Sequence, residues 1–235
     1  MTLITMNRRG IGYFMAELLI VTLGVSISLF MANQLDKLKR QNTEYEVLSV
    51  IKKNLQRDSL MVHYQIMVLD KLIDYTDRLH ADTIKESLDS LNICLDGVCS
   101  YSSTILTEVG FMEMTNNQIV LSNDTLYRAV LDYYTTTNDL FREWRDIDKK
   151  YILDDVIPFV IDHFENLTIY DTPEGSRFGF SEWPDEKSLK QHAFQNRLVT
   201  NLIYKKNILA ITKVVEQKNN QLLTFVQKDL TRFKK

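Results

Sequence analysis

Two cysteines, Cys94 and Cys99, are the residues of this chain best suited to covalent chemistry. Between them lies Asp96-Gly97, a dipeptide typical of a two-residue β-hairpin turn. Such a turn would set the two cysteines directly opposite each other, within reach of a disulfide bond. The pattern predicts a small disulfide-linked hairpin, and the alternative is a pair of reduced thiols in a loop. Because disulfides persist in oxidising compartments, a bond here would favour an extracytoplasmic domain.

The remaining reactive side chains form no recognisable catalytic or metal-binding motif. His163 stands between Asp162 and Glu165, but the two or three further ligands that a metal ion needs are not apparent. The sequence contains no Walker loop, zinc-protease H-E-x-x-H, hydrolase G-x-S-x-G or redox C-x-x-C. We therefore predict that the chain is not an enzyme, and we expect no metal ion or other cofactor.

Composition narrows the fold and the partners. The 235 residues carry a net charge of −3, which provides no basic field for nucleic acid. Only 7 glycines and 3 prolines are present, which argues against the many turns of an all-β fold. Apolar residues recur instead at helical spacing, which predicts an all-α protein.

The elements that position these residues begin with an apolar stretch from Gly10 to Leu35, in which Glu17 carries the only formal charge. A helix of this length crosses the ~30 Å hydrocarbon core of a bilayer. We predict a short cytoplasmic tail over 1–10, a transmembrane helix over 11–34 and a periplasmic helical domain over 35–235.

Arg8 and Arg9 precede this stretch, as they would in a cleaved signal peptide. The apolar run is longer than a signal core and no small-residue cleavage site follows it, so we expect it to remain as an anchor. Basic residues on its two sides are nearly balanced, and the predicted disulfide decides the orientation. The expected location is a bacterial inner membrane, with the chain crossing once, its N-terminus in the cytoplasm and its C-terminal domain in the periplasm.

Small residues repeat every four positions in the predicted span, at Gly24, Ser28 and Ala32. This spacing allows two helices to approach closely, although glycine and serine are also common in spans for other reasons. Glu17 lies seven residues before Gly24, on nearly the same face. It either reaches the cytoplasmic interface or hydrogen-bonds across a helix–helix contact. We predict a homo-oligomer that packs through these four residues.

Beyond the span, the sequence predicts an antiparallel helical bundle. A first apolar stripe, interrupted by Asp58 and Gln65, indicates a long amphipathic helix ending near Leu79. The cluster Ser122-Asn123-Asp124 is a helix-start signal, and Pro158 should kink or restart the helix that follows. A last helix is expected over roughly 187–233. The stripe of the first long helix comprises Val47, Ile51, Leu55, Val62, Ile66, Leu69 and Ile73.

One long loop is expected over 166–186, where two of the three prolines lie. It carries four aromatic residues. They either anchor a partner protein or plug the open end of the bundle, and the plug is favoured. These residues are Tyr170, Phe178, Phe180 and Trp183.

The stretch Ala16 to Val25, followed by Ala32-Asn33-Gln34, resembles the opening of a bacterial family of single-span membrane proteins classed as a domain of unknown function. That opening reads approximately G-E-x-x-L-V-x-x-G-x-x-x-A-L before an Asn-rich exit. Here Ala16 replaces the usual glycine, and Asn33-Gln34-Leu35 replaces Asn-Trp-Asn. The resemblance implies a single span and a helical soluble part, and it gives no activity to carry over to this chain. Further similarities lie at Thr107 to Phe111, Asn123, Leu126, Tyr133-Tyr134 and a helix containing Asn201.

Two functions fit these features. The first is a membrane-anchored interaction or scaffold protein that oligomerises through its transmembrane helix and docks another membrane or periplasmic protein. The second is a periplasmic bundle that senses a small ligand between its helices. Because only about ten residues precede the span, a sensor would have to signal through a second protein.

Overall fold

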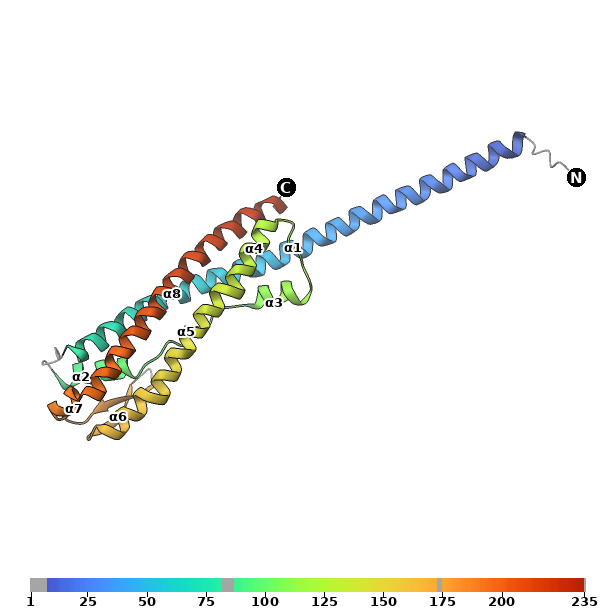
Figure 1. Ribbon diagram of the computed structural model, residues 1–235. Helices are drawn as coiled ribbons and strands as arrows, with labels where there is room; N and C mark the ends of the chain where they lie inside the picture. Colours follow the sequence, from blue (N-terminus) through green and yellow to red (C-terminus); the bar gives the residue numbers. More distant parts are fainter. Residues whose placement is uncertain (1–7, 82–86, 173–174, 235) are drawn as a thin grey trace, which may run out of the picture.

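The computed structural model describes residues 8–81, 87–172 and 175–234 and shows a helical domain with a protruding helical stalk (Figure 1). Both parts belong to one helix, α1 (Arg8–His80). No glycine or proline occurs between residues 25 and 80, so nothing in the sequence weakens its backbone hydrogen bonds. An all-α chain with one long apolar N-terminal helix was predicted, and this is confirmed.

A second long rod starts at Asn123, whose side chain caps the helix by accepting a hydrogen bond from the Leu126 N–H at 3.2 Å. Two π-helical segments interrupt this rod, and each shifts the buried face. Pro158 lies in the first turn after the second π-helical segment, where a missing N–H is tolerated. Its segments are α4 (Asp124–Leu131), η1 (Asp132–Thr137), α5 (Asn138–Tyr151), η2 (Ile152–Val156) and α6 (Ile157–His163).

The longest partner of α1 is α8 (His192–Leu230), and the two helices run in opposite directions. The Asn219 side chain donates to the Leu55 carbonyl at 2.9 Å, while at the far end His80 contacts Gln195 at 2.8 Å. Shorter helical elements complete the domain. They are α2 (Leu88–Val98), α3 (Val109–Asn116), α7 (Glu186–Lys190) and η3 (Thr231–Lys234).

The core forms two apolar clusters along the domain. The cluster nearer the stalk contains the first part of the predicted α1 stripe, and the far cluster gathers residues from α2, α6 and the start of α8. The cluster nearer the stalk includes Leu48, Ile51, Leu55, Val62, Val130, Phe141, Val215 and Leu222. The far cluster includes Leu79, Leu91, Leu95, Ile152, Phe159, Phe180, Phe194 and Leu198.

The predicted loop over 166–186 contains a β-hairpin, made of β1 (Leu167–Thr172) and β2 (Gly175–Phe180). Asn92 of α2 holds its end: the Phe180 N–H donates to Asn92 Oδ1 at 2.7 Å, and Asn92 Nδ2 donates to the Phe180 carbonyl at 3.1 Å. Gly179 permits this approach, since a Cβ there would lie 2.9 Å from the Asn92 side chain.

The prediction of a disulfide-linked hairpin was wrong. Cys94 lies within α2 and Cys99 directly after it, and both thiols are free and buried. Asp96-Gly97 continues the helix instead of forming a turn. Gly97 serves a close contact between helices, because a Cβ at this position would lie 2.6 Å from the Tyr75 ring of α1. The inference of an oxidising compartment therefore loses its disulfide support.

Candidate functional site

A buried ion pair joins Lys205 of α8 to Asp148 of α5, and both side chains are fully buried. The Lys205 ammonium contacts the two carboxylate oxygens at 2.7 and 2.8 Å and donates to the Ser100 carbonyl at 2.7 Å. Along α8, Lys205 stands between Leu198 of the far cluster and Val215 of the cluster nearer the stalk. The pair thus lies at the seam between the two clusters.

The Lys205–Asp148 pair connects separate parts of the fold. Burial lowers the pKa of Lys205, and the neighbouring Asp148 carboxylate opposes that shift. Burial, with the nearby Asp96 carboxylate, raises the pKa of Cys99 to about 12, so this thiol is a poor nucleophile at neutral pH. The arrangement ties the end of α2 to α5 and α8.

A second buried carboxylate, Asp58 of α1, interrupts the predicted apolar stripe. Its two oxygens accept hydrogen bonds from the Thr107 N–H at 3.0 and 3.1 Å and so fix the segment that leads into α3. Asp58 is fully buried, and this desolvation raises its pKa to about 6 despite the hydrogen bonds.

Asp58 should make folding stability depend on pH. The folded chain binds the Asp58 proton more tightly than the unfolded chain does. The protonated carboxyl group therefore adds to the free energy of unfolding below pH ~4, and this contribution is lost as the pH rises through about 6. The expected loss is about 2–3 kcal/mol. Urea unfolding of the full chain in detergent, followed by circular dichroism from pH 4 to 7, measures it. The Asp58→Asn variant should show a flatter profile, and an unchanged profile contradicts the assignment.

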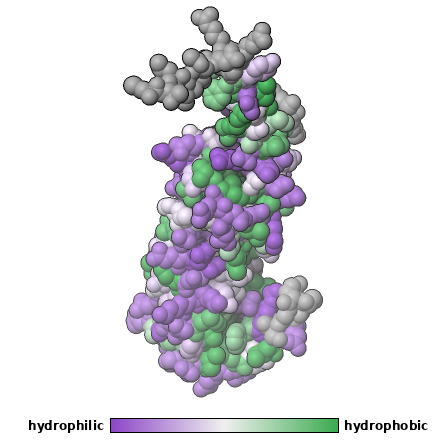
Figure 2. Space-filling model, turned by 90° about the vertical axis from the view of Figure 1, so that its right-hand side faces the viewer, coloured by the Kyte–Doolittle hydropathy of each residue, from purple (hydrophilic) through white to green (hydrophobic). Residues whose placement is uncertain are grey.

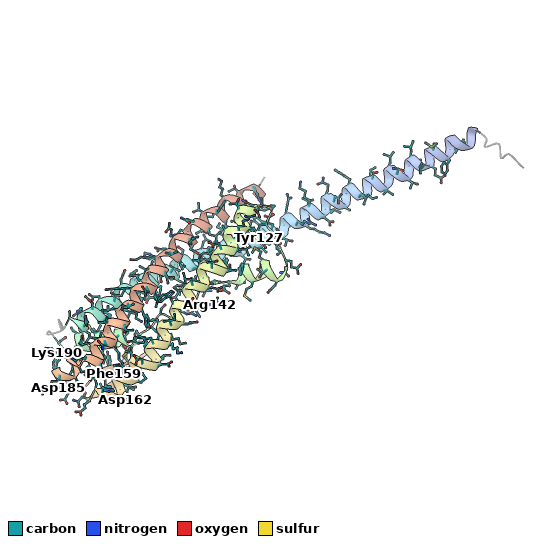
Figure 3. All side chains as sticks on the ribbon, in the orientation of Figure 1. Tyr127, Arg142, Phe159, Asp162, Asp185 and Lys190 are labelled. Carbon is teal, nitrogen blue, oxygen red and sulfur yellow. The ribbon has the colours of Figure 1, made fainter. Side chains whose placement is uncertain are left out.

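The four histidines lie on helices. His163 stacks on Phe159 with ring centroids 4.0 Å apart, and His63 approaches Glu216 at 3.2 Å. Phe159 and Asp162 lie at the end of the domain far from the stalk (Figure 3). Across residues 8–81, 87–172 and 175–234, no three His, Cys, Asp or Glu residues form a group that could hold a metal ion.

The four residues predicted to pack in the membrane, Glu17, Gly24, Ser28 and Ala32, are all exposed on the stalk. No atom beyond the helix's own backbone lies within 4 Å of where a Cβ on Gly24 would stand. In Figure 2, hydrophobic side chains, drawn green, lie near the upper end of the molecule and also among the purple hydrophilic ones further down. The stalk is the one helix among the described residues that is long and apolar enough to cross a membrane.

The same face of α1 continues onto the domain, first with exposed polar residues such as Asn42 and Glu46 and then with two exposed apolar side chains. Gly24 and Leu60 are 36 residues apart, as are Ser28 and Tyr64, and 36 residues make about ten helical turns. Leu60 is 76% exposed and Tyr64 62% exposed. Val62, two residues from Leu60 and hence on the opposite side of the helix, is fully buried. We call the side that carries these four residues the outward face of α1.

The four aromatic residues of the predicted loop have different surroundings. Phe180 is buried, with its ring centroid 5.5 Å from that of Phe164, and Phe178 packs against the same far cluster. Tyr170 is half-buried on β1, whereas Trp183 is 48% exposed. Phe178 and Phe180 therefore contribute to the end of the core, while Trp183 is available at the surface.

Searches against protein-family models, curated proteins and solved structures found no match to this chain. The resemblance of the span to a family of unknown function stays a prediction, and the functional argument depends on geometry.

Proposed function

We propose that this protein is a membrane-anchored scaffold in which α1 pairs with α1 of a second copy while the antiparallel bundle docks a periplasmic partner. The observation that carries this proposal is that the small residues of the stalk and the exposed Leu60 and Tyr64 lie on one side of α1, its outward face. In the stalk this face carries small residues, which allow the backbones of two helices to approach closely. Beyond the stalk the face is polar at Asn42 and Glu46, and further along it carries Leu60 and Tyr64, whose burial from water favours association.

Pairing through this face places the two domains without a clash. Val62 and the buried side chains on its side of α1 point into their own domain, and Leu60 and Tyr64 point away from it. Two copies that meet along the outward face therefore keep their domains on opposite sides of the paired helices. Glu17 lies on the same face, where its carboxyl group hydrogen-bonds the partner helix and is removed from lipid.

We also propose a single span in a bacterial inner membrane, with the N-terminus in the cytoplasm. Arg8 and Arg9 precede the apolar stretch and three basic residues follow it, so the positive-inside rule does not decide this orientation, which the impermeant crosslinker described below tests. The free cysteines are compatible with it, because burial keeps the Cys99 thiol protonated. The exposed side chains of Ile169 and Trp183 at the far end are the surface we assign to the partner.

Crosslinking at Tyr64 tests the paired arrangement. In spheroplasts, the Tyr64→Cys variant should form a covalent dimer with a membrane-impermeant bismaleimide. Adding Ser28→Ile should lower the dimer yield about tenfold, equivalent to about 1.4 kcal/mol of association free energy. Ser26→Ile, the same change two residues away and off the outward face, is the matched control and should leave the yield unchanged.

Three results would contradict the proposal. Equal losses from Ser26→Ile and Ser28→Ile would show that pairing does not use the outward face. A Tyr64→Cys chain that never crosslinks in intact spheroplasts would exclude a periplasmic dimer through this face. Recovery of the full chain in the supernatant after ultracentrifugation without detergent would exclude the anchor itself.

A further inference from the structure

A groove of about 890 Å³ opens where α1 leaves the domain. One wall is the part of α1 that follows the predicted span, and the other is the segment joining α3 to α4, which lies beside the emerging stalk in Figure 1. Among its lining residues are Lys37, Lys39 and Arg40 from α1, and Asn117, Gln118 and Val120 from the joining segment.

The groove offers unneutralised positive charge. Within the described residues, Lys37, Lys39 and Arg40 take part in no ion pair. Of the two acids that line the groove in the described part of the chain, Glu44 is already engaged and Asp36 is not, which leaves three cations against one carboxylate. Glu44 accepts hydrogen bonds from the Ser122 N–H at 2.7 Å and from Arg232. The excess of cations over free carboxylates favours an anionic occupant.

The position of the groove identifies the source of that anion. Lys37 and Arg40 follow the end of the predicted span by three and six residues, which at ~1.5 Å per residue places them about 5–9 Å beyond it. The polar headgroup layer of one leaflet is about 5–8 Å thick. The two cations therefore lie at the level of the lipid phosphates. Val120, 71% exposed on the facing segment, adds an apolar contact at this depth.

We infer that this groove binds the phosphate headgroup of an anionic phospholipid from the leaflet that the stalk enters. The inference depends on the membrane anchoring proposed above. The Lys37 ammonium and Arg40 guanidinium contact the phosphate oxygens, and the Asn117 and Gln118 amides offer donors to the glycerol part. The groove opens on the side of α1 that faces the domain, so a bound lipid does not compete with pairing through the outward face.

Lipid retention by the full chain in nanodiscs tests this inference. Wild-type protein is reconstituted in phosphatidylcholine mixed with phosphatidylglycerol, and native mass spectrometry counts the lipids that remain bound. We expect preferential retention of phosphatidylglycerol. The variant Lys37→Gln/Arg40→Gln should reduce the preference about twenty-fivefold, because each cation near an anionic surface contributes about fivefold. The control Lys53→Gln/Lys71→Gln removes two exposed charges of α1 away from the groove and should retain it.

The outcomes separate this inference from the proposed function. A chain that fails to enter nanodiscs overturns the anchor. A chain that enters them but shows no lipid preference, or loses it equally in both double variants, overturns only the headgroup site. Glycerol 1-phosphate added to nanodiscs of pure phosphatidylcholine is the probe for a free anion. If it is retained as well as phosphatidylglycerol, and through the same two cations, the occupant is a soluble phosphate compound and the lipid assignment fails.

Discussion

Replacing Lys205 with methionine should lower the free energy of unfolding by about 3–5 kcal/mol. The Asp148 carboxylate would remain fully buried without its counter-charge, and the Ser100 carbonyl would lose its donor. Both losses occur at the seam between the two apolar clusters, where water does not reach the carboxylate. Urea unfolding of the full chain in detergent, followed by circular dichroism, measures the difference.

Two further variants separate the buried pair from a general effect of losing a lysine. Lys218 lies on α8 like Lys205 and pairs with Asp132 of η1, and both side chains of this pair are about half exposed. Lys218→Met should therefore lower the free energy of unfolding by at most about 1 kcal/mol. Combining Lys205→Met with Asp148→Leu removes both buried charges and should recover part of the stability, because the Ser100 carbonyl and the Ser102 N–H still lack their partners. A Lys205→Met chain as stable as the Lys218→Met chain would show that the buried pair contributes little.

Replacing Phe180 with alanine should cost about 3–5 kcal/mol, the range for removing a buried phenylalanine ring. Phe180 is 2% exposed and contacts Phe164, which in turn meets Phe194 at a centroid distance of 4.9 Å. The cavity would open at the end of the core, beside the hairpin that Asn92 holds. The same urea experiment gives the stability loss, and amide hydrogen exchange shows whether β1 and β2 open with it.

Trp183→Ala is the matched control in the same segment. Trp183 is 48% exposed, so its removal should change stability by no more than about 0.5 kcal/mol. If Trp183 anchors a partner, its loss should instead weaken capture of that partner by the folded protein. Similar stability losses in the two variants would contradict the division of the aromatic residues into core and surface.

The two long helices could be predicted because their apolar residues repeat with helical spacing over many turns. Asp58 and Gln65 were interpreted as interruptions of the α1 stripe, yet both are buried on it. Their partners, Thr107 and Thr104, lie some forty to fifty residues further along the chain. A polar residue at a stripe position signals a buried hydrogen bond, but periodicity alone does not identify the partner.

The errors concern residues whose role depends on a distant neighbour. Asp96-Gly97 has the local chemistry of a turn, but the flat surface of Gly97 is needed against Tyr75. The segment over 166–186 has the glycine and proline content of a loop, but Asn92 of α2 holds its end as a strand. In both places a tertiary contact determines the conformation against the preference of the local sequence, and the neighbouring residues do not indicate that contact.

Because α1 is one continuous helix, the stalk and the helical domain are joined without a flexible linker. From the predicted membrane exit at residue 34 to its end at residue 80, the helix is about 70 Å long at ~1.5 Å per residue. Spanning helices tilt by about 20° on average, and such a tilt carries the tip sideways by roughly 24 Å. No joint at the water boundary absorbs this movement. In the membrane-anchored arrangement proposed above, the angle of the helix in the bilayer therefore sets how far, and in which direction, the distant tip can reach.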